Sequence, residues 1–223
     1  MLSSFLGLAP FPILILLGIF LGFLKIFDLQ NARTFNLFIF YIAIPCVIFE
    51  AVTKSNLEGI KFGLLVSYFI MQTVAGSIAC YITHRFFSRS TPEAIIWGLT
   101  VALSNHVLIV LPLSKIFFDD SIALHVSSII VMDSVVLISI VTLGLEYVSK
   151  IKIDLHKYFQ GLLKNPLIIA VVISIIIKVS EIKLSESVVG VITFKLAQTT
   201  MPIGLISMGI ILSYYLNRSV TKL

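Results

Sequence analysis

The sequence predicts an all-α fold, a polytopic membrane helical bundle of about seven transmembrane helices. Hydrophobic residues make up 58% of the 223 positions and charged residues only 12%, whereas about a quarter of the residues of a soluble domain are charged. Apolar runs of about 20 residues recur, which is the length that crosses a hydrocarbon layer about 30 Å thick. The period-two alternation of outer-membrane strands is absent, so the spans are predicted to be helices.

The predicted spans follow one another with short connections, and no soluble domain lies between them. They cover residues 8–27, 35–53, 62–83, 93–117, 121–148, 164–180 and 187–215. We therefore expect a single transmembrane domain over residues 1–223. Lys25 is the first basic residue, and Pro10 and Pro12 interrupt the first apolar run. This run is thus predicted to be a retained helix rather than a cleavable signal peptide.

The formal charge of +5 does not indicate nucleic-acid binding, because Lys and Arg are scattered between the spans rather than gathered in a patch. Their unequal distribution over alternate connections places the N-terminus outside and the C-terminus in the cytoplasm. An abundance of Ile, Lys and Phe is typical of AT-rich bacterial genomes, so we expect a multi-pass protein of a bacterial inner membrane. Cys46 and Cys80 both fall inside spans and are predicted to be buried packing thiols.

The stretch on which the functional prediction depends is residues 104–113, Ser-Asn-His-Val-Leu-Ile-Val-Leu-Pro-Leu, inside the fourth span. Pro112 has no N–H and its ring clashes with the carbonyl four residues back, so it is predicted to break the helix. Ser104, Asn105 and His106 lie two turns earlier and bring polar atoms to the break. A broken helix with a polar cluster near the bilayer midplane indicates a substrate site in secondary transporters. The alternative is a proline kink whose backbone groups are satisfied by neighbouring helices.

Proline positions suggest an internal repeat. Spans one and six each carry a proline in the first turn, and spans two and seven each carry one well inside the helix. These prolines are Pro12 and Pro166 for the first pair, and Pro45 and Pro202 for the second. An offset of five helices is odd, so the second copy must be inverted, as in alternating-access carriers. Residues 1–148 then form the first five-helix repeat, and residues 160–217 form the first two helices of an incomplete second repeat.

Two charged residues fall inside predicted spans, Asp133 in span five and Lys195 in span seven. Their predicted depths are similar, on the order of 15 Å, so they can form a charge pair that offsets part of the cost of about 2.5–3.5 kcal/mol per buried charge. Asp133 can act as a coupling group and Lys195 can attract an anion; alternatively, both face a polar crevice or snorkel. His106 can shuttle a proton near neutral pH, or it is a hydrogen-bonded packing residue.

Other polar and small residues inside the spans are predicted to serve packing. Gln72 and Thr73 in span three can hydrogen-bond across helices, and Gly204, Ser207 and Gly209 let helices approach closely. A substrate path along these small residues is the alternative.

The sequence contains no pattern of an intramembrane enzyme. There is no His-Glu-x-x-His zinc motif, no Gly-x-Ser-x-Gly elbow, no phosphate-binding Gly-rich loop and no pair of intramembrane carboxylates. We therefore expect no enzymatic activity, no catalytic residue, no metal site and no cofactor.

Four segments, in this order and spacing, resemble motifs of the auxin efflux carrier family of membrane transporters, which includes bacterial malonate-type carriers. These segments are Phe35 to Pro45, Ser104-Asn105 followed by Leu111-Pro112-Leu113, Leu163 to Leu167, and Met201 to Gly209. The resemblance implies ten helices in two inverted repeats, with the fourth and ninth helices broken and crossing at the substrate site. It also implies that spans one, two, six and seven form a scaffold that makes a homodimer contact, while spans three to five move.

By this resemblance, Asn105 and Pro112 are the positions expected to face substrate. Two departures from the family pattern are visible. The motif glycines are Val107 and Val110 in this chain, which removes flexible backbone from the crossover. The last three helices of the family pattern have no counterpart among the seven predicted spans.

The resulting functional prediction is an efflux carrier of small organic anions that works by proton- or ion-linked alternating access in the lipid bilayer. The anion would be held at the broken helix by Ser104, Asn105, His106 and Pro112, where half-helix N-termini present free N–H groups and positive dipole ends. The alternative is a truncated, inactive remnant, or a scaffold-only membrane partner protein that transports nothing.

Overall fold

The computed structural model describes residues 8–54, 62–87, 89–118, 121–133, 148, 161, 163–182 and 187–220. All regular secondary structure in these residues is helical. The helices are α2 (Pro10–Phe23), α3 (Leu29–Phe38), η1 (Ile39–Ala43), α4 (Ile44–Lys54), α5 (Phe62–Phe86), α6 (Thr91–Ala102), η3 (His106–Val110), α7 (Leu111–Phe117), α8 (Ser121–Met132), α11 (Pro166–Val179) and α12 (Val188–Val220). The predicted all-α class is confirmed; most of span five after Asp133 lies outside the described residues.

Three stretches of the described chain are helices long and apolar enough to cross a membrane: Leu29–Thr53, Phe62–Phe86 and Val188–Arg218. Two shorter apolar helices, α2 and α11, accompany them. The large hydrophobic side chains that α5 and α12 expose are those expected of surfaces that face lipid rather than water. The molecule is therefore a helical membrane bundle.

The second span begins earlier than its hydropathy predicts. Asp28 and Asn31 form a reciprocal capping box, in which each side-chain oxygen accepts the other residue's backbone N–H at 2.9 and 3.0 Å. This cap starts α3 at Leu29 rather than at residue 35. The first turns of α3 are polar, so hydropathy alone did not detect them.

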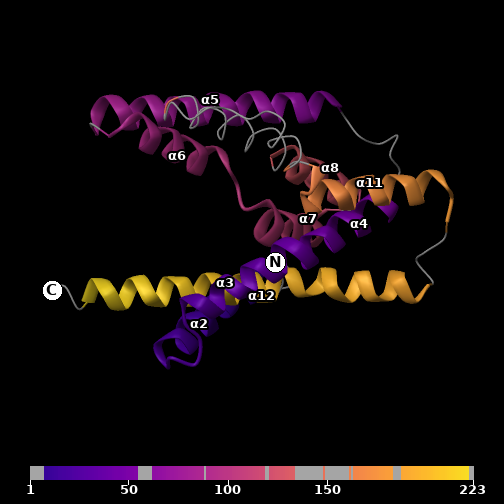
Figure 1. The fold of residues 1–223 in the computed structure, drawn as a ribbon, viewed down its shortest axis with the longest axis horizontal. Helices are drawn as coiled ribbons and strands as arrows, with labels where there is room; N and C mark the ends of the chain where they lie inside the picture. Colours follow the sequence, from indigo (N-terminus) through magenta and orange to yellow (C-terminus); the bar gives the residue numbers. More distant parts are fainter. Residues whose placement is uncertain are drawn as a thin grey trace.

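In Figure 1 the helices form three levels. α5 and α6 lie together at the top, α12 crosses the bottom with α2 and α3 against it, and α4, α7, α8 and α11 lie between. The buried apolar core of this middle level is formed by α4, α7, α8 and α11 and contains Val47, Ile48, Val52, Leu111, Val126, Ile130, Leu167 and Ala170.

The small-residue face of α12 makes close contacts, as predicted. A Cβ on Gly209 would meet the backbone of Ile15 and Gly18 in α2, so these two helices touch backbone to backbone. The Ser207 hydroxyl lies 3.1 Å from the Ala32 carbonyl oxygen and 2.9 Å from Asn36 Oδ1 in α3. These contacts fix α2 and α3 rigidly on α12.

Gly204 is the third member of this face, and it contacts a different segment. A Cβ at Gly204 would meet the side chain of Leu108 in η3. Close packing is therefore confirmed at all three small residues: Gly209 contacts the backbone of α2, Ser207 hydrogen-bonds to α3, and Gly204 contacts the fourth span.

Two helices, α2 and α11, are alike in detail. Each has 14 residues and begins with proline, Pro10 or Pro166. Each ends in a Schellman turn whose left-handed residue is not glycine: Lys25 has φ 57° and Glu181 has φ 55°. The structure therefore matches Pro10, rather than Pro12, with Pro166.

The packing of these helices is reciprocal. α2 packs on α12, and α11 packs on α4. If α2 corresponds to α11, and the second span to α12, one two-fold operation exchanges the two contacts.

Candidate functional site

The fourth span is broken at residues 103–105. The last bond of α6 joins the Leu103 N–H to the Leu99 carbonyl at 2.9 Å, and Leu103 itself is extended, with φ −78° and ψ 122°. Asn105 has φ −80° and ψ 72°, and the His106 N–H donates to the Ser104 carbonyl at 2.9 Å. This is an inverse γ-turn, so the break satisfies part of its own backbone.

Asn105 also starts the second half of the helix. Its side-chain oxygen accepts the Leu108 N–H at 3.1 Å, and its carbonyl accepts the N–H groups of Ile109 and Val110 at 3.1 and 3.2 Å. A side chain that both closes a turn and caps a helix favours a break at its own position. The predicted broken helix is confirmed.

The predicted cause of the break is wrong. Pro112 is the second residue of α7, beyond the π-helical turn η3, in which the Leu111 N–H donates to the His106 carbonyl. The wider turn accommodates the missing N–H and the proline ring without interrupting the helix. The chain leaves the helix at Leu103, two turns before the proline, and the polar residues thought to lie near the break are the break itself.

The structure brings three of the four predicted substrate residues together and separates the fourth. Ser104 and Asn105 are exposed, whereas the His106 side chain next to them is buried. Pro112 is half-buried in α7. The break thus presents two accessible polar side chains in front of one buried imidazole.

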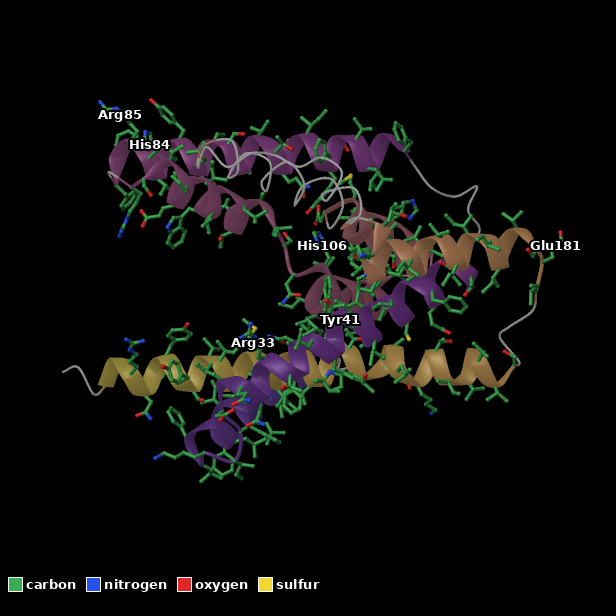
Figure 2. The ribbon with its side chains drawn as sticks, viewed as in Figure 1. Arg33, Tyr41, His84, Arg85, His106 and Glu181 are labelled. Atoms are coloured by element: carbon green, nitrogen blue, oxygen red, sulfur yellow. The ribbon has the colours of Figure 1, made fainter. Side chains whose placement is uncertain are left out.

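His106 contacts α5 on one side of its ring. Its Nε2 lies 3.0 Å from the Tyr68 hydroxyl, and the two rings meet edge to face with centroids 5.4 Å apart. In Figure 2 His106 lies in the middle of the molecule, between the level of α5 and the level of α12. The imidazole therefore joins the broken helix to α5.

The other ring nitrogen of His106 faces α8. Nδ1 lies 3.2 Å from Asp133 Oδ2, and the second carboxylate oxygen, Oδ1, accepts a 2.8 Å hydrogen bond from the Gln72 amide in α5. Gln72, His106 and Asp133 expose only 5%, 7% and 5% of their surfaces. We call Tyr68, Gln72, His106 and Asp133 the buried polar cluster.

Two buried acceptor atoms of the buried polar cluster lack a hydrogen-bond donor among the described residues. Asp133 Oδ2, in spite of its closeness to His106, and Gln72 Oε1 are both buried and receive no hydrogen bond from the part of the chain that the structure describes. Burying an acceptor without a donor costs about 1–3 kcal/mol. Such a cluster is costly for stability alone, so a functional use is favoured.

Asp133 and Lys195 do not form the predicted charge pair. The described partners of the Asp133 carboxylate are His106 and Gln72, whereas Lys195 is exposed on α12. Equal depth in the bilayer allowed the pair, but depth does not determine which way a side chain faces around its helix.

The sequence predicted one of the two α5 residues of the cluster. Gln72 does hydrogen-bond across helices, but Thr73 donates to the Phe69 carbonyl of its own helix at 2.7 Å. Tyr68 was missed, although it lies four residues before Gln72 and so on the same helix face.

The described residues contain no group of three or more His, Cys, Asp or Glu side chains that could hold a metal ion. Cys46 and Cys80 are separate free thiols. The side chains of Ser104, Asn105 and His106 at the break can form hydrogen bonds in front of a helix end.

Comparison with known proteins gives this arrangement its context. A family described as membrane transport protein matches residues 4–220. The chain is 30% identical over 105 residues to the uncharacterized transporter YfdV of Escherichia coli strain K12, a match that covers 44% of this chain and 32% of the relative. It is 34% identical over 92 residues to an uncharacterized transporter of Methanothermobacter thermautotrophicus, covering 40% and 30%.

These matched stretches span about a third of each relative's length. The family match, in contrast, runs over nearly the whole chain. It agrees with the auxin efflux carrier-like motifs in the sequence, with the helical membrane fold and with the broken fourth helix. The chain belongs to this family of membrane transport proteins.

Proposed function

We propose that this chain is a secondary transporter that exports small organic anions by alternating access, with the anion bound at the break between α6 and η3. The observation that carries the proposal is the break itself. It places exposed Ser104 and Asn105 at the start of a half-helix, directly in front of buried His106. Membership of a transport family supports the general activity.

The break offers an anion three favourable contacts. η3 and α7 form one continuous helical half whose N-terminal end carries a partial positive charge. The Asn105 amide and the Ser104 hydroxyl are exposed there and can donate to a carboxylate. A carboxylate thus suits the site better than a cation does.

The packing supports a division into a fixed and a moving part. α2 and α3 are locked onto α12 by the backbone contact at Gly209 and the hydrogen bonds of Ser207. The broken helix touches α12 through the apolar contact of Leu108 with Gly204, which has no directional bond to lose when the segments slide.

We propose an inverted repeat, with residues 1–148 as its first copy and residues 160–217 as part of its second. Two observations support it: α2 and α11 are alike, and they pack reciprocally on α12 and α4.

We place the protein in a bacterial inner membrane with the N-terminus outside and the C-terminus in the cytoplasm. We also propose a homodimer formed through the fixed part. Reporter fusions at Asn56 and Ser88 should report outside and inside, respectively.

Exchange of radiolabelled malonate by the purified full chain in proteoliposomes tests the proposed function. We expect saturable exchange, and we expect Asn105→Ala to lower its rate at least tenfold. Asn165→Ala is the matched control, because Asn165 also caps an apolar helix, accepting the Leu167 N–H at 2.9 Å, but lies outside the break. This control should keep parent-level exchange.

A panel of mono-, di- and tricarboxylates offered as competitors then defines the substrate class. Failure of every carboxylate to exchange through the parent chain would contradict the proposal and favour a scaffold or remnant that carries nothing. Equal losses in Asn105→Ala and Asn165→Ala would show that helix capping, rather than the break, accounts for the effect.

A further inference from the structure

The buried polar cluster behind the break is one donor short. We propose that His106 and Asp133 form a binding site for one exchangeable proton, which is carried together with the anion. The coupling to an anion rests on the proposed function, whereas the proton site rests on the geometry of the cluster alone.

The contacts define one consistent arrangement of hydrogens without the extra proton. The Tyr68 O–H donates to His106 Nε2, the Nδ1–H points toward Asp133 Oδ2, and the Gln72 amide N–H donates to Asp133 Oδ1. In this state the imidazole is neutral and the carboxylate is ionised. The cluster then carries one negative charge, buried, with Oδ2 lacking a hydrogen bond.

One added proton neutralises the buried negative charge and provides the hydrogen bond that Asp133 Oδ2 lacks. The proton adds to His106 Nε2, and the Tyr68 hydroxyl rotates to accept from Nε2–H. The proton already on Nδ1 is then held between Nδ1 and Asp133 Oδ2, so that the cluster is neutral and Oδ2 has a donor. The proton belongs to the pair rather than to either residue, because Nδ1 and Oδ2 lie only 3.2 Å apart. The cluster therefore has two states that differ by one proton and by one unit of charge.

Among the side chains that the structure describes, the Asp133 carboxylate has an ion-pair contact with His106 and none with a Lys or Arg. Of the elements packed against η3, α8 contributes His125 and is followed directly by Asp133, while the sequence of α7 contains Ser114 and Lys115. α12 approaches through Gly204, and its Lys195 is exposed. Tyr68 and Gln72 complete the surroundings from α5.

The position of the cluster links this proton to the anion. His106 follows Ser104 and Asn105 directly in the chain, so an anion at the break lies next to the buried carboxylate. Because Asp133 is buried, the repulsion between its negative charge and that of the anion is only weakly screened. The anion and the proton should therefore bind together, so that each exported anion takes one proton with it and an imposed inward proton gradient drives the same carrier in reverse.

Solid-state NMR of the full chain in lipid bilayers, labelled with 15N-histidine and 13C-aspartate, tests the proton site without any substrate. We expect the His106 ring and Asp133 carboxyl signals to change together over one pH interval between about pH 5 and about pH 8. His106→Gln and Asp133→Asn assign the signals, and each should abolish the change at the other residue. His84→Gln, at the exposed end of α5 (Figure 2), is the matched control and should leave both signals unchanged.

Signals that change at separate pH values, or that do not change in this range, would overturn the proton site. A second measurement, uptake of radiolabelled malonate into proteoliposomes under an inward proton gradient, tests the coupling. We expect at least tenfold accumulation by the parent chain and none by Asp133→Asn, which mimics the protonated carboxyl, lies outside the predicted anion-binding residues and should still exchange malonate. Exchange that ignores the proton gradient would overturn the coupling but leave the proposed function standing, whereas no exchange at all would contradict the proposed function and leave the NMR result to decide the proton site.

Discussion

The second and fourth spans contain the same local device and differ in what precedes it. In both, a five-residue π-helical turn is followed by an α-helix whose second residue is proline, η1 before Pro45 and η3 before Pro112. The second span nevertheless runs unbroken from Leu29 to Thr53. The fourth is broken, because the residues before η3 are Leu103, Ser104 and Asn105 rather than Asn36, Leu37 and Phe38. The π turn accommodates the proline, and the Ser-Asn pair makes the break.

The two spans also differ in how they are held against α12. The second is anchored by the Ser207 hydroxyl to the Ala32 carbonyl and Asn36. The fourth touches α12 through the side chain of Leu108 at Gly204. Hydrogen bonds hold the second span in one arrangement, as suits a fixed scaffold. An apolar contact permits several arrangements of the fourth span, as suits a moving helix.

The largest effect on malonate exchange is expected when the fourth span is made into a continuous helix. In the double variant Ser104→Ala/Asn105→Leu, good helix formers replace the two residues that favour the turn. We expect the fourth span to become continuous like the second and malonate exchange to fall at least tenfold, while the thermal unfolding temperature stays the same or rises. Parent-level exchange in this variant would contradict the role of the break.

The converse change, which introduces a Ser-Asn pair into the second span, should lower the stability of the protein. Leu37→Ser/Phe38→Asn places a Ser-Asn pair at the corresponding positions before η1. We expect the free energy of unfolding in detergent to fall by about 2 kcal/mol, because half-buried Phe38 loses apolar contacts and freed backbone groups find no water. Leu37→Ile/Phe38→Leu is the control; an unchanged stability of the Ser-Asn variant would mean that sequence before a π turn does not decide continuity.

A smaller effect is expected from removing the polar anchor of the second span. Ser207→Ala loses both hydrogen bonds to α3 and should lower the free energy of unfolding by about 1 kcal/mol. Thr193→Ala, which removes a hydroxyl bonded only within α12, should change it by less than about 0.5 kcal/mol. Equal effects of the two substitutions in chemical unfolding would show that the anchor does not hold the spans together.

The smallest effects should come from the prolines. Pro45→Ala and Pro112→Ala each restore an N–H in a turn that already accommodates its absence, so each should change the free energy of unfolding by less than about 1 kcal/mol. Both variants should keep malonate exchange within about threefold of the parent rate, a difference smaller than about 0.7 kcal/mol. Abolished exchange in Pro112→Ala alone would restore the proline as the cause of the break.

Within the described residues, hydropathy predicted the positions of the spans, because bilayer thickness fixes the length of an apolar helix. It misplaced the start of α3, where the Asp28–Asn31 capping box begins a polar turn. The sequence analysis placed the polar break at Ser104, Asn105 and His106 but assigned its cause to Pro112. The effect of a proline depends on whether the preceding turn is α-helical or π-helical, and the local sequence does not reveal this.

Side-chain partners were predicted less well than positions. Asp133 and Lys195 were matched by depth, but the partners of Asp133 are His106 and Gln72. Tyr68 was not considered, although its spacing from Gln72 places both on one face of α5. Which face of a helix meets which neighbour depends on packing across the whole bundle, and a single sequence does not determine it.

The central claim is that the break in the fourth span, and not its proline, forms a water-accessible anion site. Single cysteines test it directly when placed at Ser104 and at Leu37, which occupies the corresponding position in the second span, in a chain whose Cys46 and Cys80 are replaced by alanine. Both positions are exposed in the structure. We predict that a membrane-impermeant thiol reagent labels Ser104→Cys, that malonate slows this labelling, and that Leu37→Cys, facing lipid, is not labelled. Equal labelling of the two positions, or labelling of Ser104→Cys that malonate does not slow, would contradict the claim.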